Sequence, residues 1–320
     1  LTDKKELPGA SLKVTDEDGN TVDEWVSKEE AHIIKGLIVG KKYKMTETKP
    51  ADGYVTAESI EFTVENTKEV QKHQMLDDVT KVEISKKDIT DSSEVPGAKL
   101  IILDKDGKKV ESWTSTDKPH MVEKLPVGEY TLREEQAPDG YLIAEDVKFT
   151  VKDTGKIQKV KMKDAHPYGK LVIKKTDSTS KAALPGAEFE LREKESGKVV
   201  EKLVTDKTGT ATSGKIPIAT YKNGKVEKTV EYILVETKAP NGYELSSKKE
   251  EIRFEYKDGK TKVIEIVKEI KNTKSPSGST PTGNSPKTGD STNIWLPILL
   301  AVLSACGIGG VIWYKKKKGN

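Results

Sequence analysis

Two lysines end the apolar face of predicted strands at equivalent places in this chain, Lys86 and Lys175. The apolar residues that share a face with them are Val82 and Ile84, and Leu171 and Ile173. Because successive side chains of a strand point to opposite faces, both lysines are expected to point inward. Lys87 and Lys174 are the competing assignments, but their parity points outward.

Acidic and amide side chains end two further inward series. In each middle strand a tyrosine, an apolar residue and a glutamate share one face, and these glutamates are Glu47, Glu134 and Glu236. In each last strand the inward series ends on Asp77, Asp164 or Asn272. A buried lysine and a buried carboxylate are both unfavourable unless they are paired, so these positions are candidates for chemistry.

An inward lysine, a glutamate and an aspartate or asparagine form a set that can react. Burial lowers the pKa of a lysine and raises that of a glutamate, which favours a neutral amine and a protonated acid. The amine can attack the side-chain carbonyl while the glutamate moves protons. The product is an amide between two side chains, with loss of water from Asp or of ammonia from Asn. Proximity in a folded core would supply much of the lowering of the barrier.

The strands that must position these residues belong to a unit repeated three times. One motif of the repeat occurs at Leu7–Ala10, Val95–Ala98 and Leu184–Ala187. A second motif occurs at Asp52–Tyr54, Pro138–Tyr141 and Pro240–Tyr243. Short alternating runs separated by Asp-Gly and Asn-Gly turns predict that each unit is an all-β sandwich.

The repeats divide the chain into five predicted parts. They are β-sandwich domains at 1–79, 80–167 and 168–274, a Ser/Pro/Thr/Gly linker at 275–284 and a C-terminal segment at 285–320. The third domain carries an extra stretch, roughly Lys207–Val230, that is expected to form a longer hairpin. Few residues separate the domains, which predicts a semi-rigid, rod-like stalk.

Composition excludes several classes of function. The 55 basic and 52 acidic residues are interspersed, with a net charge of +3, so no basic stripe for nucleic acid is present. The single cysteine, Cys306, lies in the apolar C-terminal run and leaves no disulfide for the domains. The histidines have no metal-ligand spacing; they are His32, His73, His120 and His166. We predict neither an enzyme nor a bound metal or cofactor.

The repeated motifs resemble the B-type, prealbumin-like domains of collagen-binding adhesins and pilins of Gram-positive bacteria. The resemblance covers Leu1–Lys274 and implies spontaneous intramolecular isopeptide bonds. Carried over by position, it joins Lys86 to Asp164 with the assistance of Glu134. In the third domain it joins Lys175 to Asn272 with the assistance of Glu236. The alternative is that these residues form buried ion pairs or hydrogen bonds and do not react.

The first domain retains the candidate catalytic Glu47 and the candidate bond partner Asp77. Its lysine is expected ten or eleven residues before Gly9, just upstream of Leu1, so its bond is expected to be incomplete. Lys4 and Lys5 are too close to the turn at Leu7–Ala10 to substitute. The chain also starts without a secretion leader, which suggests the C-terminal part of a longer precursor.

The C-terminal segment resembles the cell-wall sorting signal of Gram-positive surface proteins. An LPxTG-like pentapeptide, Ser285-Pro286-Lys287-Thr288-Gly289, precedes an apolar run at 294–314 and a basic tail at 315–320. The run is long enough to span a membrane as a helix, and the lysines after it would remain in the cytoplasm. Ser285 replaces the usual leucine, which leaves the class of sortase open.

The sorting signal implies that a sortase cuts between Thr288 and Gly289. Thr288 would then be joined to a peptidoglycan cross-bridge or to a pilin lysine, so the membrane is a partner only before sorting. The alternative is a plain C-terminal membrane anchor with a chance motif. Either one places the domains outside the cell.

These observations predict a cell-wall-anchored structural or adhesin protein whose domains form a covalently locked stalk. Two alternatives stay open: the stem of a surface enzyme with an upstream catalytic domain, or a pilin subunit polymerised by sortase. The sequence does not identify a host ligand.

Overall fold

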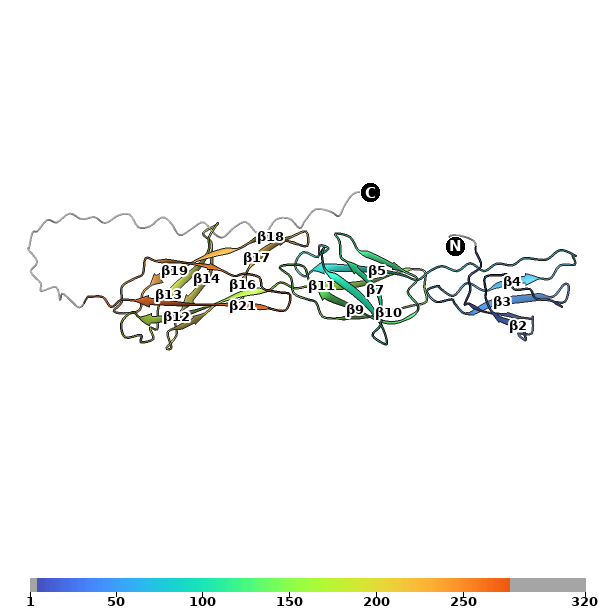
Figure 1. Cartoon of the computed structure of the whole chain (residues 1–320), viewed down its shortest axis with the longest axis horizontal. Helices are drawn as coiled ribbons and strands as arrows, with labels where there is room; N and C mark the ends of the chain where they lie inside the picture. Colours follow the sequence, from blue (N-terminus) through green and yellow to red (C-terminus); the bar gives the residue numbers. More distant parts are fainter. Residues whose placement is uncertain (1–4, 277–320) are drawn as a thin grey trace, which may run out of the picture. The chain divides into compact units, whose positions relative to one another are not determined.

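The computed structural model of the chain describes residues 5–276, in which every regular element is a β-strand (Figure 1). The all-β prediction is confirmed for this part. Most of the predicted linker, the sorting motif, the apolar span and the basic tail lie outside the described residues. Within residues 5–276 no helix is long and apolar enough to cross a membrane.

The strands of the first unit form one antiparallel sheet in the order β2-β1-β3-β4. They are β1 (Ser11–Thr15), β2 (Thr21–Val26), β3 (Lys42–Lys49) and β4 (Ile60–Thr63). The sequence pattern predicts a last strand that ends at Asp77, but residues 64–79 contain no strand. In the second unit the corresponding strand pairs with the unit's first strand. The described residues of the first unit contain no such neighbour, so a backbone ladder cannot form there.

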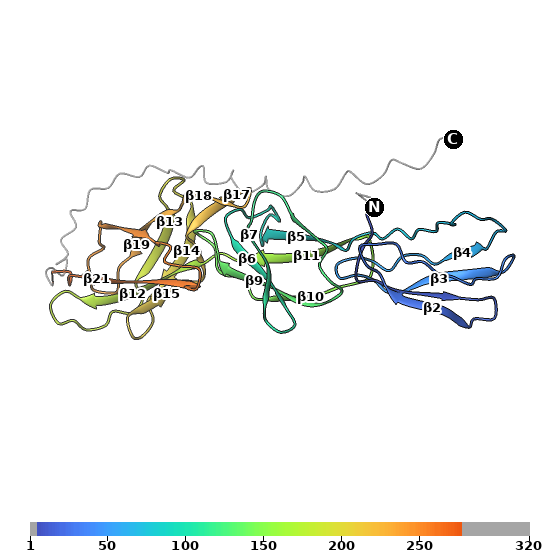
Figure 2. The ribbon, with the colours of Figure 1, turned by 45° about the vertical axis from the view of Figure 1, so that its right-hand side comes forward.

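The second unit is a sandwich of two sheets, ordered β10-β9-β6-β7 and β11-β5-β8. Its strands are β5 (Lys81–Asp88), β6 (Lys99–Asp104), β7 (Lys109–Thr114), β8 (His120–Glu123), β9 (Gly128–Gln136), β10 (Val147–Val151) and β11 (Ile157–Asp164). The first and last strands, β5 and β11, are parallel neighbours, and they lie side by side in Figure 2.

The third unit repeats this arrangement with additional strands. Its sheets are β14-β13-β19-β20 and a second sheet in which β12 pairs with β15, β16 and β21. The strands are β12 (Tyr168–Asp177), β13 (Glu188–Glu193), β14 (Val199–Val204), β15 (Thr210–Thr212), β16 (Ile216–Pro217), β17 (Ala219–Lys222), β18 (Lys225–Thr229), β19 (Glu231–Lys238), β20 (Lys249–Arg253) and β21 (Val263–Asn272). Here too the first and last strands, β12 and β21, are parallel neighbours.

The apolar faces of the two sheets meet in one core in each of these units. In the second unit Ile84, Leu100 and Leu132 come from three strands of the two sheets, and each is almost fully buried. Their equivalents in the third unit are Ile173, Phe189 and Leu234. The alternation that places these residues inward also places Lys86 and Lys175 inward, at the end of the core.

The extra stretch of the third unit contains a two-stranded hairpin, β17–β18, within the expected range. Asn223 and Gly224 turn it with positive φ angles of 53° and 69°, which is the combination that a tight hairpin turn requires. Its Tyr221 hydroxyl donates to the carbonyl of Gly140 at 2.8 Å, and the Tyr221 ring stacks on His166. The hairpin therefore contacts the second unit, a contact that the sequence does not predict.

Candidate functional site

The parallel pairing of first and last strands brings each candidate lysine to its predicted partner. On β5 and β11, Lys86 lies opposite Met162, two residues before Asp164. On β12 and β21, Lys175 lies opposite Ile270, two residues before Asn272. Two residues along a strand return to the same face, so lysine and acceptor both point into the core.

The glutamates come from the opposite sheet. Glu134 lies on β9 and Glu236 on β19, at the point where a bulge shifts the pairing with the neighbouring strand. A backbone N–H ten residues further on donates to each carboxylate, from Ala144 at 2.7 Å and from Ser246 at 2.9 Å. These bonds hold each glutamate above the lysine that faces it.

In the second unit Lys86, Glu134 and Asp164 form one buried cluster. The Lys86 Nζ lies 2.9 Å from Glu134 Oε2 and contacts Asp164 Oδ1 directly. The lysine side chain is 2% exposed and both carboxylates are 0% exposed. An amine and two carboxylates so far from water favour a shared proton over full ionisation.

The carboxylate oxygens of this cluster indicate where that proton lies. Glu134 Oε1 and Asp164 Oδ2 are buried and have no hydrogen-bond partner in the described structure. Burial, with a further contribution from the charge of Glu134, raises the pKa of Asp164 to about 7, against the opposing effect of Lys86. A proton held by the two carboxyl groups would satisfy both oxygens and leave Asp164 as a neutral acid.

The third unit builds the same cluster with an amide in place of the acid. The Lys175 Nζ donates to Asn272 Oδ1 and lies 3.0 Å from Glu236 Oε1. The Asn272 Nδ2 donates to both oxygens of Glu236, at 3.0 and 3.1 Å. The Asn272 amide thus always has a hydrogen to donate to the glutamate, whereas Asp164 has one only when its carboxyl group is protonated. Burial lowers the pKa of Lys175, although the hydrogen bond to Glu236 opposes this.

The first unit contains only part of this arrangement. Glu47 is 4% exposed and accepts a hydrogen bond from the Ala57 N–H at 2.6 Å, as the other two glutamates do. Burial raises the pKa of both Glu47 and Asp77. The part of this unit that the structure describes contains no lysine equivalent to Lys86.

The competing lysines lie outside the clusters. Lys87 is half-buried and pairs with Glu94 at 2.8 Å, and Lys174 is exposed. The parity of the alternation therefore identifies the correct inward lysine in both units.

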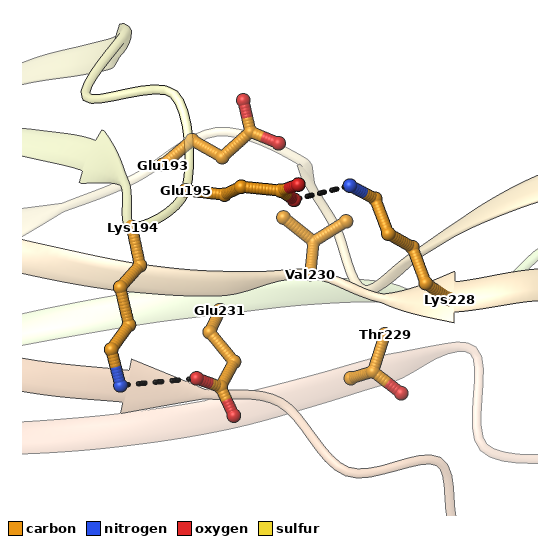
Figure 3. Close-up of a pocket in the computed structure, with 7 residues that line it drawn as sticks. All are labelled: Glu193, Lys194, Glu195, Lys228, Thr229, Val230 and Glu231. Atoms are coloured by element: carbon orange, nitrogen blue, oxygen red, sulfur yellow. Dashed lines mark hydrogen bonds and ion pairs between the residues drawn. The ribbon is translucent and has the colours of Figure 1, made fainter.

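Other features of the described residues give no second site. Residues 5–276 contain no cluster of His, Cys, Asp and Glu that could hold a metal ion. A surface hollow beside β18 is lined by charged side chains that pair with each other, Lys194 with Glu231 and Lys228 with Glu195 (Figure 3). Ion pairs close this hollow, and it offers little apolar surface to a ligand.

Comparison with known proteins identifies the family. The family described as SpaA, prealbumin-like fold domain, matches residues 1–78, 80–166 and 169–270. The chain belongs to this family, with three copies of its domain in tandem. A search of curated proteins finds no match.

Solved structures of similar fold come from Gram-positive bacteria. The chain is similar to the Bacillus anthracis TIE protein, with 29% identity, a TM-score of 0.53 and coverage of 85% of this chain. It spans about half of that protein, 49%. It is also similar to BcpA, the major pilin subunit of Bacillus cereus, with 19% identity, a TM-score of 0.44 and coverage of 86% of this chain and 97% of that one.

The amide bonds that the sequence analysis expects in the two clusters should form with different pH dependence. The raised pKa of Asp164 keeps it protonated below about pH 7. Above that value the neutral acid becomes about tenfold rarer with each pH unit, and loss of water slows accordingly. Asn272 does not titrate. We therefore expect the rate of water loss, divided by the rate of ammonia loss, to fall as the pH is raised from about 6 to about 8.

Mass spectrometry of unreacted chain, purified in denaturant and diluted into buffers of different pH, measures this ratio. The third unit is the internal control for effects of pH on folding. The variant Asp164→Asn should remove the difference between the units. A constant ratio in the original chain would contradict a neutral Asp164.

Proposed function

We propose that this chain is a surface structural protein of the pilin type whose second and third domains are each locked by an intramolecular amide bond. The observation that carries the proposal is the repeated buried cluster of lysine, glutamate and Asp or Asn. Two units of different sequence place the same three groups in contact, at the same positions of the same strands. Because burial of charged groups costs more than their pairing usually returns, stabilisation by an ion pair alone does not account for these clusters.

The reaction in the second domain is a condensation. The neutral Lys86 Nζ attacks Cγ of the protonated Asp164, and the bond from Cγ to the hydroxyl oxygen breaks. Glu134 accepts a proton from the attacking nitrogen and delivers it to the departing hydroxyl group, which leaves as water. Because the glutamate contacts the amine and lies beside the acid, it can act as both base and acid.

The reaction in the third domain differs only in its leaving group. The neutral Lys175 Nζ attacks Cγ of Asn272, and the bond from Cγ to Nδ2 breaks. Glu236 lies within 3.0 Å of the attacking nitrogen and 3.0–3.1 Å of the departing one. It transfers a proton from the first nitrogen to the second, and ammonia leaves. Contacts this short, made within a folded core, correspond to a high effective concentration.

A bond at this place protects the domain against tension. The chain enters each domain at its first strand and leaves at its last, and these strands are the parallel neighbours that the bond would join. A bond from Lys86 to Asp164 would carry force past residues 87–163. The domains would then resist sustained pulling better than a core held by reversible contacts.

The proposal includes attachment of the stalk to the cell wall. A sortase would cleave after Thr288 and join it to a peptidoglycan cross-bridge or to a pilin lysine. Support comes from the order of motif, apolar run and basic tail along the sequence, together with family membership. The protein would then be extracellular and not an enzyme.

A second candidate is that the chain is the stem of a larger surface protein with its own active domain. The observation that favours it is the similarity to the TIE protein, of which this chain spans about half. The locked domains serve the same mechanical purpose under both proposals.

The test of the amide bonds is the intact mass of the full chain under denaturing conditions. We expect a mass lower than that of the sequence by one water and one ammonia. Proteolysis should then release branched peptides that join Lys86 to Asp164 and Lys175 to Asn272. An unshifted mass would contradict the proposal.

Removal of the glutamates should restore the full mass. The double variant Glu134→Gln, Glu236→Gln keeps size and hydrogen bonding but cannot transfer the proton, so both losses should disappear or slow by about a hundredfold or more. The matched control is Glu135→Ala, because Glu135 is exposed on the same strand. Its mass loss should equal that of the original chain.

Wall attachment is tested separately with Thr288→Ala in the full chain, expressed in a Gram-positive host that has a sortase. We expect the variant to leave the peptidoglycan fraction, because sortase transfers the carbonyl of this residue. The variant Thr282→Ala, outside the sorting motif, controls for general effects on secretion. Retention of Thr288→Ala in the wall fraction would overturn sortase attachment and leave the amide bonds unaffected.

A further inference from the structure

A tyrosine–aspartate hydrogen bond closes the same end of the second and third domains. The Tyr141 hydroxyl donates to Asp88 Oδ2 at 2.8 Å, and the Tyr243 hydroxyl donates to Asp177 Oδ2 at 2.9 Å. Each aspartate lies two residues after the candidate lysine, as the last residue of β5 or β12. In the proposed mechanism neither residue of these pairs has a role.

Each aspartate also lies directly beside the acceptor residue. In the parallel ladders Asp88 is opposite Asp164, and Asp177 is opposite Asn272. The residue after each aspartate donates its N–H to the acceptor's own carbonyl, Ile89 to Asp164 at 3.0 Å and Ser178 to Asn272 at 2.9 Å. The end of the lysine strand is thus fastened to the backbone of the acceptor.

The tyrosine fastens the same point to the strand of the glutamate. After β9 the chain turns through Pro138–Tyr141, with a hydrogen bond from the Tyr141 N–H to the Pro138 carbonyl at 3.1 Å. Gly140 has a φ of +89°, which suits glycine at the third position of such a turn. The third domain repeats the turn after β19 at Pro240–Tyr243, with the same 3.1 Å bond. In each domain this hydrogen bond therefore joins the turn that follows the glutamate strand to the end of the lysine strand, which pairs with the acceptor strand.

The aspartates are ionised, which makes the bonds to tyrosine strong. Burial alone would raise the pKa of Asp88, but hydrogen bonds from Thr90, Tyr141 and His166 outweigh it and lower the pKa to about 2. Hydrogen bonds from the backbone N–H groups of Ser180 and Thr179 and from Tyr243 lower the pKa of Asp177 to about 2. A hydrogen bond to a buried carboxylate is short and directional, and it fixes the strands that it joins.

We propose that Asp88–Tyr141 and Asp177–Tyr243 are positioning pairs for amide-bond formation. They fix how far the lysine strand is shifted along its own direction, so that the lysine amine faces both the glutamate and the acceptor. The proposal rests on the proposed amide bonds and adds residues that do not touch the reacting atoms. The strand ladders alone do not join the lysine strand to the sheet that carries the glutamate.

The experiment follows bond formation over time in the full chain carrying Tyr141→Phe or Tyr243→Phe. Unreacted chain is diluted from denaturant, quenched at intervals and weighed. We expect Tyr141→Phe to slow water loss by about tenfold, because small misplacements of reacting groups reduce rates by up to about a hundredfold. Ammonia loss in the same molecule should keep its rate. Tyr243→Phe should give the reverse pattern.

Two further tyrosines provide the matched control. The Tyr130 and Tyr232 hydroxyls donate to the carbonyls of Pro126 and Pro217, at 2.8 and 2.6 Å, on the same strands as the glutamates. Tyr130→Phe and Tyr232→Phe therefore remove a hydroxyl that is bonded to a backbone carbonyl and not to an aspartate. Their rates should equal those of the original chain. Equal slowing in control and test variants would show a merely structural role and overturn the proposal.

A second variant covers the case in which Tyr141→Phe does not fold. Asp88→Asn keeps the size of the side chain and removes its charge, and it should slow water loss severalfold while ammonia loss in the same molecule keeps its rate. The original rate of water loss in Asp88→Asn would overturn the positioning role while the amide bonds stand. Absence of any mass loss in the original chain would instead overturn the proposed bonds.

Discussion

A lysine buried in the core of a small β-sandwich is the constraint on which the structure of each complete domain depends. An amine so far from water is tolerated only with partners in contact, and loss of one partner of such a pair costs about 3–5 kcal/mol. Lys86 and Lys175 each have two such partners, one from the neighbouring strand and one from the opposite sheet. The need to satisfy the amine thus fixes how the two sheets face each other.

The parallel pairing of first and last strands follows from the same constraint. An acceptor can reach the lysine only from a strand beside it, two residues out of register on the same face. The first domain shows the converse. It retains a buried glutamate, but its described residues contain no first strand of this kind, and residues 64–79 form no ladder. The described residues of the first domain therefore form a single sheet.

Much of this site could be predicted from the sequence, because alternation in strands is strict. Parity alone selected Lys86 over Lys87 and Lys175 over Lys174, and the burial of these side chains agrees. The contact between Asp88 and Tyr141 could not be predicted in this way. Tyr141 belongs to a repeated motif, yet its contact with Asp88 depends on a glycine turn and on the pairing of distant strands. The contact of Tyr221 with the second domain is likewise a tertiary effect without a periodic signal.

The change from Asp164 to Asn272 shows how one geometry can serve two acceptors. The lysine and glutamate occupy equivalent places, and only the atom that faces the glutamate differs. An asparagine arrives with hydrogens that bind the glutamate at any pH, whereas an aspartate must first be protonated, which its burial promotes. Burial thus favours the proton on Asp164 that faces Glu134, whereas Asn272 already carries the equivalent hydrogen on its amide nitrogen. Under the proposed reaction, the burial of Asp164 that folding produces is also what makes this residue a neutral acceptor.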